Sequence, residues 1–170
     1  KVKRPNIERV IETDLSLFHF VITQMEKVSE EVRFLGLSRV IRDFSISLHK
    51  ELNFSIELLN CKRLKKNLEV HDKEKIFYLP KVYEEYSSKE VLVMEFLDGI
   101  PFSDDKKVRD LVEEIQPKLE KGIVLFFKTF LEDGLFHADL HGGNFFYLKD
   151  KRMGLIDFGL MGTLSQKGRR

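Results

Sequence analysis

Asp139, Asn144 and Asp157 are the residues of this chain whose types and spacing could do chemistry together. Magnesium takes a few hard oxygen ligands, and the carboxylate of Asp157 with the amide oxygen of Asn144 would supply two of them. Asp139 lies five residues before Asn144, where a carboxylate could accept a proton from an acceptor group or orient a water. Because phosphoryl transfer depends mainly on positioning and charge neutralisation around ATP and magnesium, this set predicts that reaction with those two cofactors.

The spacing of the three residues is typical of the catalytic and metal-binding segments of protein-kinase-like phosphotransferases. Asp157 opens an Asp-Phe-Gly sequence thirteen positions after Asn144. Apolar residues at 145–146 and 153–156 flank a polar turn, which predicts a β-hairpin that presents Asn144 at one end and Asp157 at the other. The glycine pair 142–143 lets the loop backbone bend close to a ligand.

Composition limits the other classes of function. The chain has 170 residues, of which 42% are hydrophobic, and its net charge of +1 gives no reason to expect nucleic acid as a partner. Cys61 is the single cysteine, which excludes an internal disulfide and fits a reducing compartment. No apolar run approaches the ~18 residues of a membrane span. The chain begins without Met, and we expect it to be a fragment of a longer protein.

Two helical regions come first. Apolar spacing predicts a helix over 7–29 and a longer helical region over 36–68 that is broken or kinked near 45–50. Cys61 lies on the apolar side of the second region and is expected to be a buried, small hydrophobic residue. The basic run 62–66 is expected to be a solvated helix face.

The elements next to the motif come later. Two β-rich runs, 76–83 and 90–96, bracket a polar turn. A long helix over 108–132 is predicted to kink or divide at Pro117, and Gly134 suits the position just after its C-terminus. The Phe stripe on this helix is expected to belong to the core rather than to a lipid pocket.

Four parts of the chain together resemble the UbiB-like atypical kinases, a family linked to ubiquinone biosynthesis. Residues 1–7, K-V-K-R-P-N-I, resemble the family's K-V-Q-R-P-G-I, and residues 51–60 resemble E-x-D-x-x-x-E-A-x-N. Residues 93–99 resemble the hinge V-M-E-x-x-x-G. The opening motif resembles H-A-D-x-H-P-G-N followed by L-x-D-F-G.

The resemblance implies roles for further residues. Lys1 would contact ATP phosphates and be held by a helix glutamate, Glu57, while Glu51 would face an extension of the nucleotide site. On one continuous helix, side chains six residues apart lie roughly 120° apart. We therefore expect only one of the two glutamates to point at Lys1, and the other to lie on the surface or face another element.

The resemblance also implies the adenine contacts and the architecture. Backbone contacts to adenine would come from the hinge residues Glu95, Phe96 and Leu97. The expected fold is α+β and protein-kinase-like, with residues 1–96 as a partial N-lobe with inserted helices. Residues 97–170 would form a partial C-lobe with the catalytic loop. The upstream K-x-G-Q element and alanine-rich loop of the family are not in this chain, so we do not expect full activity from it alone.

The resemblance implies the binding partners and the location of the full-length protein. The partners would be a nucleotide and isoprenoid quinone precursors or membrane lipid, and the location would be the cytoplasmic face of a membrane.

Two departures from the family pattern bear on activity. Asn53 replaces the acid of E-x-D, which leaves the role of that element open, and Gly142 replaces the usual proline, which loosens the loop.

Other interpretations stay open from the sequence. Aminoglycoside and choline-type small-molecule kinases share H-x-D-x4-N, although their second metal aspartate usually lies in I-D-W-E rather than in Ile156-Asp-Phe-Gly159. A pseudokinase that binds nucleotide without chemistry is the third interpretation. The spacing of His137 and His141 resembles that of transition-metal ligands, but no cysteine pair accompanies them. His137 is instead expected to hold the loop in its conformation.

Overall fold

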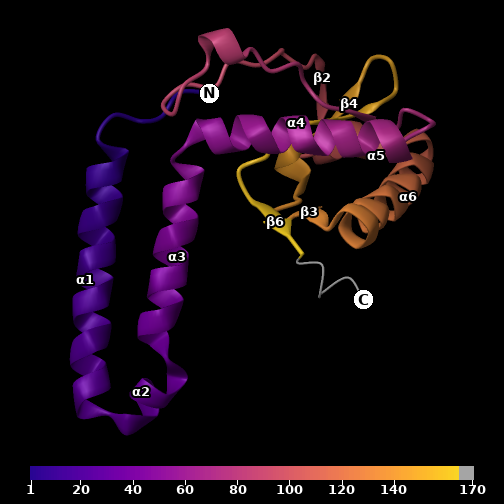
Figure 1. Ribbon diagram of the computed structural model, residues 1–170. Coiled ribbons are helices and arrows are strands. Elements are labelled where there is room, and N and C mark those ends of the chain that lie inside the picture. Colours follow the sequence, from indigo (N-terminus) through magenta and orange to yellow (C-terminus); the bar gives the residue numbers. More distant parts are fainter. Residues whose placement is uncertain (165–170) are drawn as a thin grey trace.

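The computed structural model describes residues 1–164 and shows a helical hairpin that projects from a body of helices and short strands (Figure 1). The two long arms of the hairpin are α1 (Ile7–Val28) and α3 (Leu37–Glu51). The short helix α2 (Glu30–Leu35) joins the arms at the end farthest from the body (Figure 1). The helix predicted over 7–29 is confirmed.

The second helical region divides at a different place from the predicted one. The break expected near 45–50 is wrong, because α3 continues to Glu51 and the next helix, α4 (Phe54–His71), begins after Asn53. The Asn53 side chain caps α4 by accepting a hydrogen bond from Ser55 N at 3.1 Å. The chain turns at this cap, so α4 lies across the body while α3 points away from it (Figure 1).

A four-stranded sheet carries the motif segments, in the order β1-β5-β4-β2. Its strands are β1 (Phe77–Tyr78), β2 (Gly99–Pro101), β4 (Phe145–Leu148) and β5 (Met153–Leu155). Strands β4 and β5 are antiparallel with Phe145 opposite Leu155, which confirms the predicted hairpin. Asn144 directly precedes β4 and Asp157 follows β5, so both lie at the open end of this hairpin.

A second, two-stranded sheet lies next to the loop 138–144, which carries Asp139 and Asn144 and is called the motif loop below. It pairs β3 (Leu135–His137) with β6 (Met161–Thr163) in antiparallel register. The loop after β3 leads into a short 3-10 turn, η3 (Gly142–Asn144), and from there into β4. The two sheets therefore hold both ends of the motif loop.

The β-rich runs predicted over 76–83 and 90–96 form less strand than expected. Apart from β1, they contain only an isolated antiparallel bridge between Val82 and Met94 and one between Val91 and Val2, separated by the 3-10 turn η1 (Glu84–Tyr86). Two side chains explain the shortening. The hydroxyls of Ser87 and Ser88 accept hydrogen bonds from Val93 N at 3.0 Å and Val91 N at 3.2 Å, which competes with strand pairing.

The helix predicted over 108–132 also differs. Its division lies at Leu111, between α5 (Asp105–Asp110) and α6 (Val112–Lys128), and not at Pro117, which lies inside α6. A π-helical turn, η2 (Thr129–Asp133), extends α6. Gly134 ends it in the left-handed conformation, φ 67°, as the sequence predicts.

The core lies between α4, α6 and the sheet. Its fully buried side chains include Leu64 of α4, Met153 and Leu155 of β5, and Phe158. Cys61 is also buried in this cluster, and the basic side chains of 62–66 are exposed, so both predictions are confirmed.

The Phe stripe on α6 is only partly in the core, which corrects the expectation. Phe126 packs against Phe77, with ring centroids 4.9 Å apart, whereas the side chain of Phe127 is 60% exposed. Phe126 and Phe127 are consecutive residues of a helix, so their side chains point to different faces of α6, which explains the difference.

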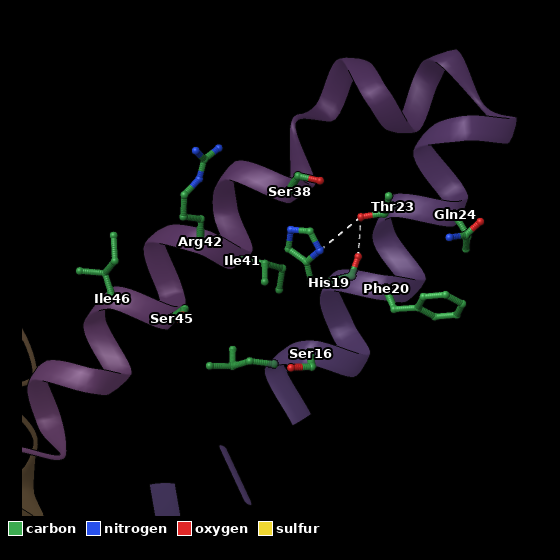
Figure 2. A pocket seen from close by; sticks show the side chains of 11 residues that line it. Ser16, His19, Phe20, Thr23, Gln24, Ser38, Ile41, Arg42, Ser45 and Ile46 are labelled. Carbon is green, nitrogen blue, oxygen red and sulfur yellow. Dashed lines mark hydrogen bonds between the residues drawn. The ribbon is translucent and has the colours of Figure 1, made fainter. Parts of the chain in front are cut away.

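A cavity of about 860 Å³ is an open groove between α1 and α3, away from the motif residues. Figure 2 shows His19 and Thr23 of α1 on one side of the groove and Ser38, Ile41 and Ser45 of α3 on the other. Helices α1, α2 and α3 bury none of their residues. Among the described residues, no helix has the length and apolarity to cross a membrane.

Candidate functional site

A cavity of about 260 Å³ brings most of the predicted site residues together. Its lining comes from the N-terminal segment, α3, α4, β3 and the turn after β5, and consists of Lys1, Glu51, Phe54, Glu57, His137, Asp139, Asp157, Gly159 and Leu160. Among these described residues, four side chains are carboxylates and one is a lysine. The excess of negative charge favours a cation in this cavity.

Lys1 is paired with the glutamate that the resemblance implies. Its Nζ donates to a Glu57 carboxylate oxygen and lies 3.3 Å from Asp157 Oδ2. Leu92 N donates to Lys1 O at 2.9 Å, so the N-terminal segment runs beside the strand-like residues that lead to the hinge. Burial raises the pKa of Glu57, although the ammonium group of Lys1 opposes that shift.

Asp157 keeps an ionised carboxylate that is directed at the cavity. Burial raises its pKa, but the hydrogen bond from Gly159 N to Oδ1, at 3.0 Å, and the charge of Lys1 outweigh burial. The net effect lowers the pKa of Asp157. The carboxylate is therefore available to a cation at neutral pH.

His137 joins the loop to the Asp-Phe-Gly turn. Its Nε2 donates to Asp157 O at 2.7 Å, and its Nδ1 accepts from Asp139 N at 3.1 Å, which requires the neutral ring with the proton on Nε2. Burial lowers the pKa of His137 and favours the same form. His137 thus holds the loop against the Asp-Phe-Gly turn, which is the role that the sequence predicts for it. Among the described residues, no cluster of three His, Cys, Asp or Glu side chains has the geometry of a metal site.

Asn144 and Asp139 are linked through the loop backbone. Asn144 Nδ2 donates to Asp139 O at 3.2 Å, and Ile156 N donates to Asn144 O at 3.1 Å. Asn144 is buried, whereas the side chain of Asp139 is 58% exposed. A fixed amide and an accessible carboxylate are what a metal ligand and a base or water-orienting group require.

Only one of the two glutamates points at Lys1, as expected: Glu57 is buried and pairs with Lys1, whereas Glu51 is exposed, although both line the same cavity. The two residues lie on different helices, because Asn53 caps a new helix between them. Burial raises the pKa of Glu51, and the negative charges of Asp157 and Asp139 raise it further. Of the two glutamates, only Glu57 forms an ion pair with Lys1 in the described structure.

The hinge residues lie outside this cavity, beside a separate hollow of about 230 Å³. The Glu95 carboxylate accepts hydrogen bonds from Lys81 N at 3.0 Å and from Tyr78 OH at 2.7 Å, and these bonds lower its pKa. Phe96 is 87% exposed and Leu97 is buried. The side chain of Glu95 therefore stabilises the hinge segment.

Sequence reasoning gave no role to Asn60, which contacts the site from behind. This buried side chain donates from Nδ2 to Phe158 O at 2.9 Å, across 98 positions of sequence. The available signals are its place as the last residue of the motif at 51–60 and its position on the buried face of α4, next to Cys61 and one turn before Leu64. A polar residue on a buried face needs a hydrogen-bond partner.

The chemistry of the two predicted metal ligands fits magnesium, although only Asp157 lines the cavity and Asn144 does not. Asp157 offers an ionised carboxylate and Asn144 an amide oxygen, and magnesium usually takes only one or two protein ligands beside phosphates and water. The bond from Asn144 Nδ2 to Asp139 O directs the amide so that Oδ1 is left for another partner. The residues are suited to a hard cation rather than to zinc, which prefers nitrogen and sulfur ligands.

Comparison with known proteins identifies the family. The ABC1 atypical kinase-like domain matches residues 1–170, the whole chain. The chain belongs to the ABC1 atypical kinase-like family. Three curated relatives share the name Probable protein kinase UbiB and come from Actinobacillus pleuropneumoniae serotype 5b (32% identity over 100% of the chain), Marinobacter nauticus (36% over 97%) and Shewanella sp. strain MR-7 (37% over 100%). The predicted resemblance to UbiB-like kinases is confirmed.

The chain covers only a part of the length of these relatives. The chain spans 31%, 30% and 31% of the lengths of these three relatives. A solved structure, Rv3197 from Mycobacterium tuberculosis in complex with erythromycin, matches with a TM-score of 0.71 and 26% identity. That match covers 96% of this chain and 39% of Rv3197, and it confirms the predicted α+β, kinase-like fold. The division into lobes at residue 97 stays a prediction.

Proposed function

We propose that the full-length protein binds ATP with magnesium and acts as an atypical kinase or ATPase that supports ubiquinone biosynthesis. The observation that carries the proposal is the meeting of Lys1, Glu57, Asp139 and Asp157 at one cavity. These residues are far apart in sequence and supply a phosphate-binding cation, its partner, a base and a metal ligand. The family assignment supports the same class of reaction.

Each residue has a role in this proposal. Lys1 binds the phosphates of ATP while Glu57 holds the ammonium group in place. Asp157 and Asn144 hold magnesium, which when bound neutralises phosphate charge. Asp139 accepts a proton from an acceptor hydroxyl or from a water. The oxygen of that hydroxyl or water bonds to the γ-phosphorus while the bond between the γ-phosphorus and the leaving ADP breaks.

The adenine end and the partners are the less direct parts of the proposal. Glu95, Phe96 and Leu97 contact adenine through their backbone, as the resemblance implies. Isoprenoid quinone precursors and membrane lipid are the proposed partners, at the cytoplasmic face of a membrane. The resemblance to UbiB-like kinases, which implies a link to ubiquinone biosynthesis, supports this choice, and the curated relatives carry the name Probable protein kinase UbiB.

The test of the metal role is Asp157→Asn in the full-length protein. Calorimetric titration with ATP, with and without magnesium, should show magnesium-dependent binding in the wild type. We expect the substitution to remove that dependence, because it replaces an ionised carboxylate with a neutral amide. The matched control is Asp43→Asn on the exposed face of α3, which should bind as the wild type does. Equal affinities for Asp157→Asn and the wild type would refute the metal role.

A second substitution separates chemistry from binding alone. Asp139→Ala should bind ATP with little change and lose phosphate release, because the base is removed while the metal ligands remain. Equal turnover by Asp139→Ala and the wild type would instead favour a pseudokinase. Stimulation of ATP hydrolysis by a phenolic quinone precursor or by anionic lipid vesicles supports the UbiB assignment. Phosphorylation of a soluble amino-alcohol contradicts it.

A further inference from the structure

We infer that Asn60 is a positioning residue of this site, one that fixes the Asp-Phe-Gly turn against α4 and so directs the carboxylate of Asp157 into the cavity. The inference rests on the proposed function, since its consequence is measured as magnesium-dependent binding of nucleotide. Asn60 does not line the cavity and acts only through the backbone of Phe158.

The geometry places both polar atoms of one residue's backbone against one helix. Asn60 Nδ2 donates to Phe158 O at 2.9 Å, and Phe158 N donates to Glu57 Oε1 at 3.3 Å. Glu57 and Asn60 are three residues apart, so they lie on the same face of α4. The backbone of Phe158 is therefore held at both its N–H and its carbonyl by a single helix.

Burial makes these contacts selective for one arrangement of the turn. Phe158 is completely buried, and Asn60 is 9% exposed. If the turn rotated away, the carbonyl of Phe158 and the amide of Asn60 would both lose a partner in a place that water reaches poorly. The next residue on the helix, Cys61, cannot replace the amide donor, because its thiol is a weak donor that is directed at Pro80 O, 3.9 Å away.

The turn has a second support, and the two supports together fix Asp157. His137 of β3 donates to Asp157 O at 2.7 Å, and Gly159 N donates to Asp157 Oδ1 at 3.0 Å. His137 thus holds the residue before Phe158 from the side of the motif loop, while Asn60 holds Phe158 from the side of α4. Because Glu57 is also the partner of Lys1, any movement of α4 shifts the lysine and the metal carboxylate together.

The test uses Asn60→Leu in the full-length protein, which removes the donor and keeps a similar side-chain volume. We expect the magnesium concentration that gives half-maximal ATP binding to rise about tenfold, the size of effect that one unsatisfied buried group produces. ATP affinity without magnesium should change less than twofold. Hydrogen exchange at the Phe158 amide should accelerate, because only the bond from Phe158 N to Glu57 then ties the turn to α4.

Two further variants keep the outcome clear. Asn67→Leu makes the same change two turns later on α4, at a half-buried position, and should leave the magnesium requirement unchanged. If Asn60→Leu does not fold, Asn60→Ala takes its place, with the same expected rise. A wild-type magnesium requirement in a folded Asn60 variant overturns the inference while the proposed function stands. Absence of magnesium-dependent ATP binding in the wild type itself overturns the proposed function and the inference with it.

Discussion

Substitution of Asp72 tests the anchor that joins α4 to the sheet, and hence the placement of Glu57. Asp72 follows the last residue of α4 and is 9% exposed. Its Oδ1 accepts from Ile76 N at 2.9 Å and its Oδ2 accepts from Phe77 N at 2.8 Å. Leaving a buried donor without an acceptor costs about 1–3 kcal/mol. Asp72→Ala leaves two buried donors without an acceptor. We therefore expect the free energy of unfolding to fall by about 2–6 kcal/mol, a large part of the ~5–15 kcal/mol of a typical domain.

The graded variant Asp72→Asn makes this test sharper. It keeps one acceptor oxygen in nearly the same place, so its cost should be about half that of Asp72→Ala. Because the chain has no Trp, urea unfolding is best followed by far-UV circular dichroism. Hydrogen exchange at Ile76 and Phe77 gives a local measure of the same loss. A cost below about 1 kcal/mol for Asp72→Ala, or equal costs for both variants, would refute the reasoning from unsatisfied donors.

Two other predictions follow from buried titratable groups. Burial lowers the pKa of His137 from its usual 6.5, against the opposing effect of the bond to Asp157 O, so the unfolded chain binds the proton more readily. The contribution of His137 to stability is thus complete above pH 6.5 and is lost as the pH falls below it; an NMR titration showing a pKa of 6.5 or higher would contradict this. Burial also raises the pKa of the Cys61 thiol to about 12, so a thiol reagent should modify the native protein far more slowly than the urea-unfolded protein. Equal modification rates would show that Cys61 is accessible in the native state.

Local patterns in the sequence were enough for the motif and its frame. The alternation of apolar and turn residues around 145–156 defines a hairpin whose ends carry Asn144 and Asp157, and the structure has that hairpin. The helix over 7–29 and the glycine stop at Gly134 also depend on neighbouring residues only. Such features are predictable because their hydrogen bonds close within a few residues.

Helix boundaries inside a longer apolar pattern were less predictable. The breaks at Asn53 and Leu111 both occur where apolar spacing continues, so periodicity does not mark them. Pro117 is a strong local signal for a break, yet α6 runs through it. The packing of the helix on the core decides its path there, since tertiary contacts can outweigh one missing backbone hydrogen bond.

The sequence by itself was enough to predict the residues proposed for the chemistry, namely Asp139, Asn144, Asp157 and Lys1, and the family to which the chain belongs. Only the tertiary structure decided that Glu51 and Glu57 share a cavity and that Asn60 holds the backbone of Phe158. The physical reason is the nature of these contacts. A hydrogen bond from a side chain to a distant carbonyl needs no particular residue type at the acceptor, so the acceptor leaves no trace in the sequence.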